Sequence, residues 1–284
     1  MDNKLLINLI PGETFLHRLT GKTKVRTFLI LMVYIIMSFD LRLILPLCIL
    51  SIIGLISLKP QWKIIKFFFI IIGLMNLLNI VLFWLADPTI GSMWCGGRTT
   101  VLFSVTERLY LSAETLWYLI VRFIKMMTSF MVSLVFILAI TPSELAAGLY
   151  SIKVPYKICT IFSIAFRYIP DIGRDFQNIK ISLQTRGVEL DPKKSSIGKR
   201  LKQNMLILIP LITTSFDRVG NISNAMDLRG YGRGKTRTYY SEHDELKADK
   251  IFKVINIILI LFCLYWIITQ NIMPDGLSMW YPFA

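Results

Sequence analysis

The run at residues 67–86 contains no charged side chain, and this limits what the chain can fold into. An α-helix of about 20 apolar residues is long enough to cross the hydrocarbon core of a lipid bilayer. Four further apolar runs lie at about residues 25–39, 43–58, 112–140 and 251–272. We therefore predict an all-α, polytopic membrane protein with about five transmembrane helices.

The Lys and Arg residues are distributed unevenly among the segments between these runs. The chain is 54% hydrophobic yet carries a net charge of +14, a combination that is rare in soluble proteins. If the amino terminus is cytoplasmic, the cytoplasmic segments hold 27 of the 32 Lys and Arg residues, as the positive-inside rule requires. We predict a protein of the cell (plasma) membrane with its amino terminus in the cytoplasm and its carboxyl terminus outside. Because the basic residues cluster between apolar runs, they indicate a lipid bilayer, and not nucleic acid, as a partner.

These runs and their flanking segments divide the chain into six parts. They are a cytoplasmic interfacial tail (1–24), transmembrane helices 1–4 (25–140), a cytoplasmic domain of long amphipathic helices (141–235), a linker (236–250), transmembrane helix 5 (251–272) and an outside tail (273–284).

A few polar side chains fall inside the predicted spans. Asn76 and Asn79 lie on one helical face, and we expect these amides to bond a neighbouring helix. Arg122 and Lys125 lie three residues apart in the fourth span. We interpret them as cations that reach the outer interface, with an intramembrane relay as the alternative.

One pattern occurs twice within residues 165–235. Each copy has three apolar residues and an arginine at spacings of three, four and three, followed by a glycine, and the copies are 43 residues apart. The first copy is Phe176, Ile179, Leu183, Arg186 and Gly187, and the second is Val219, Ile222, Met226, Arg229 and Gly230. This spacing predicts two helices, each with an apolar stripe that ends in a guanidinium group.

A single Arg-Gly pair at a helix end is ordinary capping chemistry. Repetition favours a function, because both arginines lie in phase with the stripe, where a buried helix would place another apolar residue. The two helix ends are therefore candidates for docking into acidic pockets on a partner.

Signals for a catalytic or metal site are weak. His17 and His243 belong to no metal-ligand spacing, and the four cysteines are scattered. Two Gly-Lys-Thr triplets, at residues 21–23 and 234–236, lack the upstream glycine of a phosphate-binding loop. We predict no metal site, no cofactor and no catalytic residues.

Several motifs together resemble the transmembrane T subunit of energy-coupling factor (ECF) transporters, the EcfT or CbiQ family. They are HRLTGKTKV near the amino terminus, TPSEL at residues 141–145, and FRYIP at residues 166–170 with a downstream TRG. The most specific are two three-residue arginine motifs, Thr185-Arg186-Gly187 and Leu228-Arg229-Gly230. The family often has alanine before the arginine, where this chain has Thr185 and Leu228.

The resemblance implies a coupling function for residues 141–235. In this family two cytoplasmic ABC-type ATPase subunits act through such helices on a small membrane-embedded substrate-binding (S) subunit, which captures a vitamin or a metal ion. Arg186 and Arg229 would each enter a groove on one ATPase, and ATP hydrolysis in the partners would leave this chain without enzymatic activity. The substrate-binding subunit would contact an apolar surface made of Phe162, Phe166, Ile169, Leu206 and Ile209.

Two other classes of protein stay open from the residues alone. A stand-alone secondary transporter or channel is expected to show inverted repeats or acidic groups at mid-membrane. A membrane-bound enzyme is expected to gather titratable residues near the interface. A loop is predicted at about residues 87–111. The only such group predicted outside is Glu107, Arg108 and Glu114, which we interpret as solvated.

Overall fold

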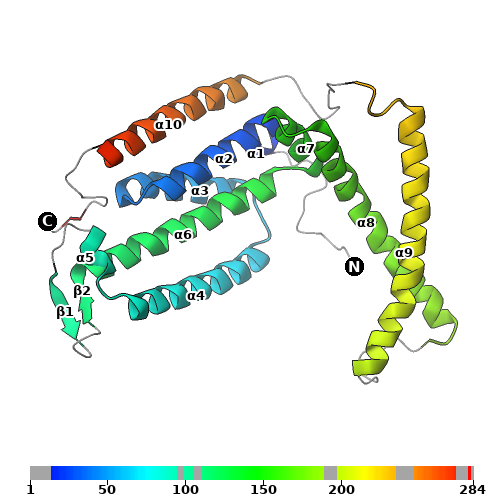
Figure 1. Ribbon diagram of the computed structural model, residues 1–284, viewed down its shortest axis with the longest axis horizontal. Coiled ribbons are helices and arrows are strands. Elements are labelled where there is room, and N and C mark those ends of the chain that lie inside the picture. Colours follow the sequence, from blue (N-terminus) through cyan, green and yellow to red (C-terminus); the bar gives the residue numbers. More distant parts are fainter. Residues whose placement is uncertain are drawn as a thin grey trace. The chain divides into compact units, whose positions relative to one another are not determined.

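Helices make up most of the residues that a computed structural model describes, which are residues 14–94, 99–104, 110–188, 197–234, 246–272 and 281–282 (Figure 1). The prediction of an all-α fold is confirmed, with one short β-hairpin added. The chain divides into two units. The first comprises Met1–Gly148 and Glu242–Ala284, and the second comprises Leu149–Ser241.

In the first unit, helix α6 (Ala113–Ala139) is central and packs against three other long helices. These are α2 (Gly21–Met37), α3 (Leu41–Ser57) and α4 (Trp62–Ala86). Helix α10 (Lys247–Ile272) packs along α2. The core between them is apolar, with Ile44 and Val121 fully buried in one cluster and Ile35 in a second. The outward faces are also apolar, as a lipid environment requires.

The five helices α2, α3, α4, α6 and α10 occupy the five ranges that the sequence predicts as spans. By length and composition, α4, α6 and residues Gln203–Leu228 of α9 are long and apolar enough to cross a membrane, and α3 is a shorter apolar helix. The sequence places α9 in the cytoplasmic domain instead, from the distribution of the Lys and Arg residues. The division of the chain into membrane and cytoplasmic parts stays a prediction.

The amides in α4 bond α6, which confirms the prediction for Asn76 and Asn79. Asn76 Nδ2 donates to the Phe123 carbonyl at 3.3 Å, and Asn79 Oδ1 accepts from Arg122 at 3.4 Å. Lys125 Nζ donates to the Ile36 carbonyl at 2.9 Å, in the last turn of α2. Lys125 therefore lies at the level where α2 ends, which fits a cation near the outer interface.

The segment predicted as a loop contains short elements: α5 (Ile90–Trp94) and an antiparallel pair, β1 (Val101–Ser104) and β2 (Tyr110–Ser112). The interpretation of Glu114 as part of a solvated loop is wrong, because its side chain is buried at the start of α6. Its carboxylate accepts the Thr100 N–H at 3.1 Å and the Thr100 hydroxyl at 2.8 Å, which ties the hairpin to α6. Glu107 and Arg108 lie outside the described residues.

Two glycines allow α2 and α7 (Pro142–Ser151) to approach closely. A Cβ atom on Gly21 would lie 2.2 Å from the Glu144 carbonyl oxygen. One on Gly148 would lie 2.4 Å from a Val25 methyl group and 2.5 Å from the Gly21 carbonyl oxygen. Both positions therefore require glycine, because the opposing atoms include backbone that cannot move away independently.

We expect Gly148→Ala to lower the stability of the detergent-solubilised protein by about 1–3 kcal/mol, because the added methyl group overpacks this contact. Thermal unfolding would measure the loss. Gly173→Ala in α8 is the matched control, since a Cβ atom there meets nothing within 4 Å. That control should be neutral or stabilise by up to about 1 kcal/mol, and equal behaviour of the two variants would contradict the close approach.

The second unit consists mainly of two long helices, α8 (Tyr156–Thr185) and α9 (Ile197–Leu228), which pack against each other. Pro170 and Pro210 lie inside these helices. Helix α7 begins in the first unit and ends in the second. The turn between α7 and α8 contains Lys153 at φ +69°.

Candidate functional site

Helices α8 and α9 end in the same backbone structure. At the end of α8, the Gly187 N–H donates to the Gln184 carbonyl and the Val188 N–H donates to the Leu183 carbonyl, both at 3.0 Å. At the end of α9, the corresponding bonds run from Gly230 to Asp227 and from Tyr231 to Met226, both at 2.9 Å. This pair of bonds is the Schellman motif, in which a glycine with positive φ closes the helix. The glycine φ angles are +85° and +69°.

The motif explains part of the repeated pattern. Leu183 and Met226 occupy the position that usually packs against the residue after the glycine, which is Val188 in one copy and Tyr231 in the other. Capping therefore accounts for the last apolar residue and for the glycine, but it does not require an arginine. The arginine needs a separate reason.

The structure places both arginines on the surface, directly after the last residue of their helices. Arg186 and Arg229 are exposed, as are Thr185 and Leu228 before them. Leu228 is 89% exposed. Each helix end thus presents a planar cation beside a protruding side chain, an arrangement suited to a groove with acidic groups.

We expect Gly187→Ala and Gly230→Ala to loosen the helix ends, because a side chain at positive φ costs about 1–2 kcal/mol. Amide hydrogen exchange should become faster in the last turn of the altered helix, where the cap bonds are weakened. Gly220→Ala, in the interior of α9 with no neighbour within 4 Å, is the control. Unchanged exchange in all three variants would rule out a contribution of the cap.

The two copies of the pattern also meet where α8 and α9 cross. Arg218 donates to Asp175 across the pair, and these residues are themselves 43 positions apart. Asp175 directly precedes the first stripe residue of one copy and Arg218 that of the other. The helices therefore cross at equivalent positions. We call the ends of α8 and α9 that carry Arg186 and Arg229 the tips, and each of these arginines lies 11 residues, or about 16 Å, beyond the crossing. Opposite charges at matching positions of the two copies are a sequence signal for this contact, which was not predicted.

The two tips lie at opposite ends of α8. In Figure 1, α8 and α9 run in opposite senses. Tyr231, just past the second tip, makes an edge-to-face contact with Tyr156 at the start of α8, with ring centroids 5.9 Å apart. Arg186 follows the last residue of α8, whose 30 residues span about 45 Å. The two arginines thus lie at opposite ends of α8 and not together.

The predicted contact surface for a membrane-embedded partner lies in the amino-terminal halves of α8 and α9, before the crossing. Most of its side chains are exposed, namely Phe162, Ile169, Leu206 and Ile209, and Phe166 is partly buried and stacks on Phe162. Each helix therefore has an apolar first half and an arginine-tipped second half.

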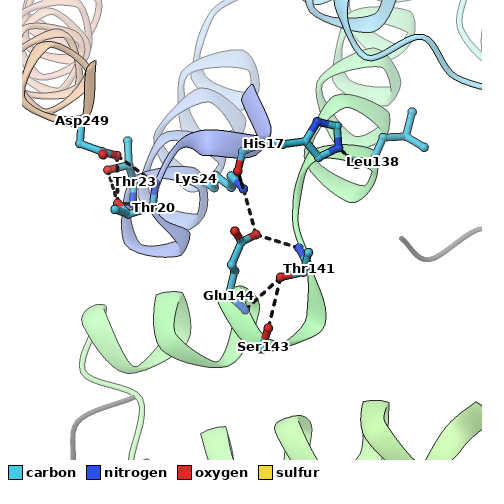
Figure 2. A network of polar contacts seen from close by, with 9 residues as sticks. All are labelled: His17, Thr20, Thr23, Lys24, Leu138, Thr141, Ser143, Glu144 and Asp249. Carbon is cyan, nitrogen blue, oxygen red and sulfur yellow. Dashed lines mark hydrogen bonds and ion pairs between the residues drawn. The ribbon is translucent and has the colours of Figure 1, made fainter. Parts of the chain in front are cut away.

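A second polar cluster lies in the first unit, where the amino-terminal motif and the TPSEL motif meet (Figure 2). Lys24 Nζ lies 2.9 Å from Glu144 Oε2, and both side chains are at least nine-tenths buried. Glu144 Oε2 also accepts the Thr141 N–H at 2.9 Å, and Thr141 Oγ1 faces the Glu144 N–H at 3.4 Å. These two bonds form a capping box at the start of α7.

Further bonds extend this cluster to α6 and α10. His17 Nε2 lies 3.1 Å from the Leu138 carbonyl, and Lys24 Nζ donates to the His17 carbonyl at 2.9 Å. Burial, followed by the charge of Lys24, lowers the pKa of His17, so its ring is neutral at pH 7 and donates to Leu138. Asp249 Oδ1 accepts both the N–H and the hydroxyl of Thr20, at 3.0 and 2.9 Å. In the sequence the two motifs are marks of the family resemblance, and the contact between them was not predicted.

Comparison with known proteins gives consistent matches over most of the chain. Residues 12–240 match the CbiQ family, described as cobalt transport protein. The energy-coupling factor transporter transmembrane protein EcfT of Lactococcus lactis subsp. cremoris is 27% identical over 274 residues, which cover 94% of this chain and 98% of that protein. The protein of the same name from Staphylococcus aureus is 28% identical over 93% of this chain and 98% of its own. The one from Bacillus subtilis is 24% identical over 84% and 89%.

Proposed function

The chain belongs to the EcfT/CbiQ family, and we propose that it is the transmembrane coupling subunit of an ECF-type ABC importer. In this function it transmits ATP-driven movement of two cytoplasmic ATPase subunits to a membrane-embedded substrate-binding subunit. The transported substrate is a vitamin or a metal ion, which the substrate-binding subunit selects. ATP is hydrolysed in the partners, and the chain itself is a scaffold in the cell membrane with its amino terminus in the cytoplasm.

The observation that carries this proposal is the pair of arginine-tipped helix ends. Both tips have the same cap and the same exposed cation, and they lie at opposite ends of α8. Two like sites at a distance of tens of ångströms fit two like partners, one at each tip. A guanidinium that binds a carboxylate through two parallel hydrogen bonds fixes the orientation of the two groups, so that movement of one displaces the other.

The crossing of α8 and α9 allows movement of the tips to displace the other halves of these helices. Asp175 and Arg218 hold the helices together at equivalent positions, so a displacement of either tip turns its helix about the crossing. The apolar half on the other side of the crossing then moves against whatever packs on it. We assign that surface, which includes Phe162 and Ile209, to the substrate-binding subunit.

A pull-down of the tagged wild-type protein tests this function. The protein is solubilised in mild detergent from its own membrane, and co-purifying proteins are identified by mass spectrometry. We expect two ABC-type ATPase subunits and a small, very apolar membrane protein whose identity reveals the substrate class. If no ATPase accompanies the wild type, the proposal is wrong and a stand-alone secondary transporter becomes the better interpretation.

A further inference from the structure

The second unit is joined to the first at two points of the chain. The chain enters it after Gly148, within α7, and returns to the first unit at Glu242, before α10. Along the chain, movement of the arginine tips reaches the first unit through these two connections. We call the second unit, Leu149–Ser241, the coupling unit, and we call the starts of α7 and α10, to which its two ends connect, its roots.

Both roots are held by one short stretch, residues 20–24, at the start of α2 (Figure 2). The α7 root is held by the buried ion pair between Lys24 and Glu144 and by the close approach of Gly21 to the Glu144 backbone. The α10 root is held by Asp249, which is buried and accepts two hydrogen bonds from Thr20.

We propose that residues 20–24 are a clamp that keeps the two roots of the coupling unit in fixed positions. This inference rests on the proposed function, and it assigns Thr20, Lys24, Glu144 and Asp249 as positioning residues for coupling. With the clamp intact, movement at the tips turns α8 and α9. Without it, part of the movement is lost as tilting of α7 and α10.

The chemistry of the clamp supports positioning over simple stability. A buried ion pair contributes little net stability compared with apolar side chains of the same size, because both charges lose their hydration. Its directional bonds do fix which groups face each other. Glu144 and Asp249 also receive backbone N–H groups at the start of their own helices, so the clamp contacts each helix at its first turn.

Distances between the two units test the clamp. A nitroxide pair is attached at Lys63→Cys and Gln177→Cys, both exposed, in the full chain with its native cysteines replaced, and double electron–electron resonance is recorded in lipid nanodiscs. Two variants remove bonds of the clamp. The first, Thr20→Val, removes the hydroxyl that bonds Asp249. The second, Lys24→Met with Glu144→Gln, removes the ion pair without leaving a buried charge unpaired. In both, we expect the distance distribution to broaden relative to the wild type.

Thr27→Val is the matched control, because the Thr27 hydroxyl accepts a 2.8 Å bond from Asn256 between the same two helices, about two turns further along α2. This control and Thr20→Ser, which keeps the hydroxyl, should leave the distribution unchanged, even if Thr27→Val lowers the melting temperature as much as Thr20→Val does. An unchanged distribution in both clamp variants, or equal broadening in Thr27→Val, would overturn the clamp. Co-purification of ATPases with the wild type is scored separately: their absence would refute the coupling function, whatever the distances show.

Discussion

The double variant Arg186→Glu plus Arg229→Glu should lose both ATPase partners while it stays folded in the membrane. Each arginine is exposed, so its replacement does not disturb the packing of α8 or α9. A central arginine in a docking site contributes about 2–4 kcal/mol to binding, and reversal of its charge adds repulsion from the acidic groups of the partner. Pull-down from the membrane, with the ATPases quantified by mass spectrometry, measures the loss.

The control for this result reverses two other arginines of α8. Arg167→Glu plus Arg174→Glu changes the net charge by the same amount at exposed positions away from the helix ends. These substitutions should leave ATPase binding close to the wild-type level, because exposed charges outside a docking site contribute little. Equal losses in both double variants would show a general charge effect and would refute docking at the tips.

Single lysine substitutions separate charge from shape at the tips. Arg186→Lys and Arg229→Lys keep the positive charge but lose the planar fork that binds a carboxylate through two hydrogen bonds. Impaired transport by protein that still inserts into the membrane is the expected result. Wild-type transport by both variants would mean that charge alone suffices.

The positions of the long helices were predictable because their signals are local. Each of the five predicted spans is a run of apolar residues in the sequence, and a helix lies on each of them. The ends of α8 and α9 were predictable for the same reason, since the Arg-Gly pairs and the spacing of the apolar residues specify a capped helix. The short pair β1 and β2 was missed, because strands of three or four residues leave no periodic pattern to recognise.

Contacts between distant residues were not predictable in the same way. Lys24 and Glu144 are 120 positions apart, and Thr20 and Asp249 are 229 apart, so their charges and hydroxyl groups looked like those of solvated segments. Glu114 was misinterpreted because its burial depends on Thr100, which lies 14 positions away and directly before β1. The pair Asp175 and Arg218 is an intermediate case. Its 43-residue separation equals the repeat length, so a comparison of the charges at matching positions of the two copies would have found it.

Lys24→Met should cause the largest loss of stability of any single substitution proposed for this chain. The Lys24 ammonium group is buried and bonds both Glu144 Oε2 and the His17 carbonyl. Its removal leaves the Glu144 carboxylate buried without a cation, which costs about 3–5 kcal/mol in comparable pairs. Thermal unfolding of the solubilised protein would measure the change. The same substitution at an exposed position, Lys63→Met, should stay within about 0.5 kcal/mol of the wild type.

A second substitution distinguishes the loss of a charge partner from the loss of packing. If the cost of Lys24→Met comes from the unpaired carboxylate, Glu144→Gln in the same chain should recover most of it, because a neutral amide oxygen can still accept the Thr141 N–H. If the cost comes from the shape of the lysine side chain, the second substitution should recover nothing. Recovery would also mean that the double variant is folded although it lacks the ion pair that holds the start of α7. Its stability and its effect on positioning could then be measured separately.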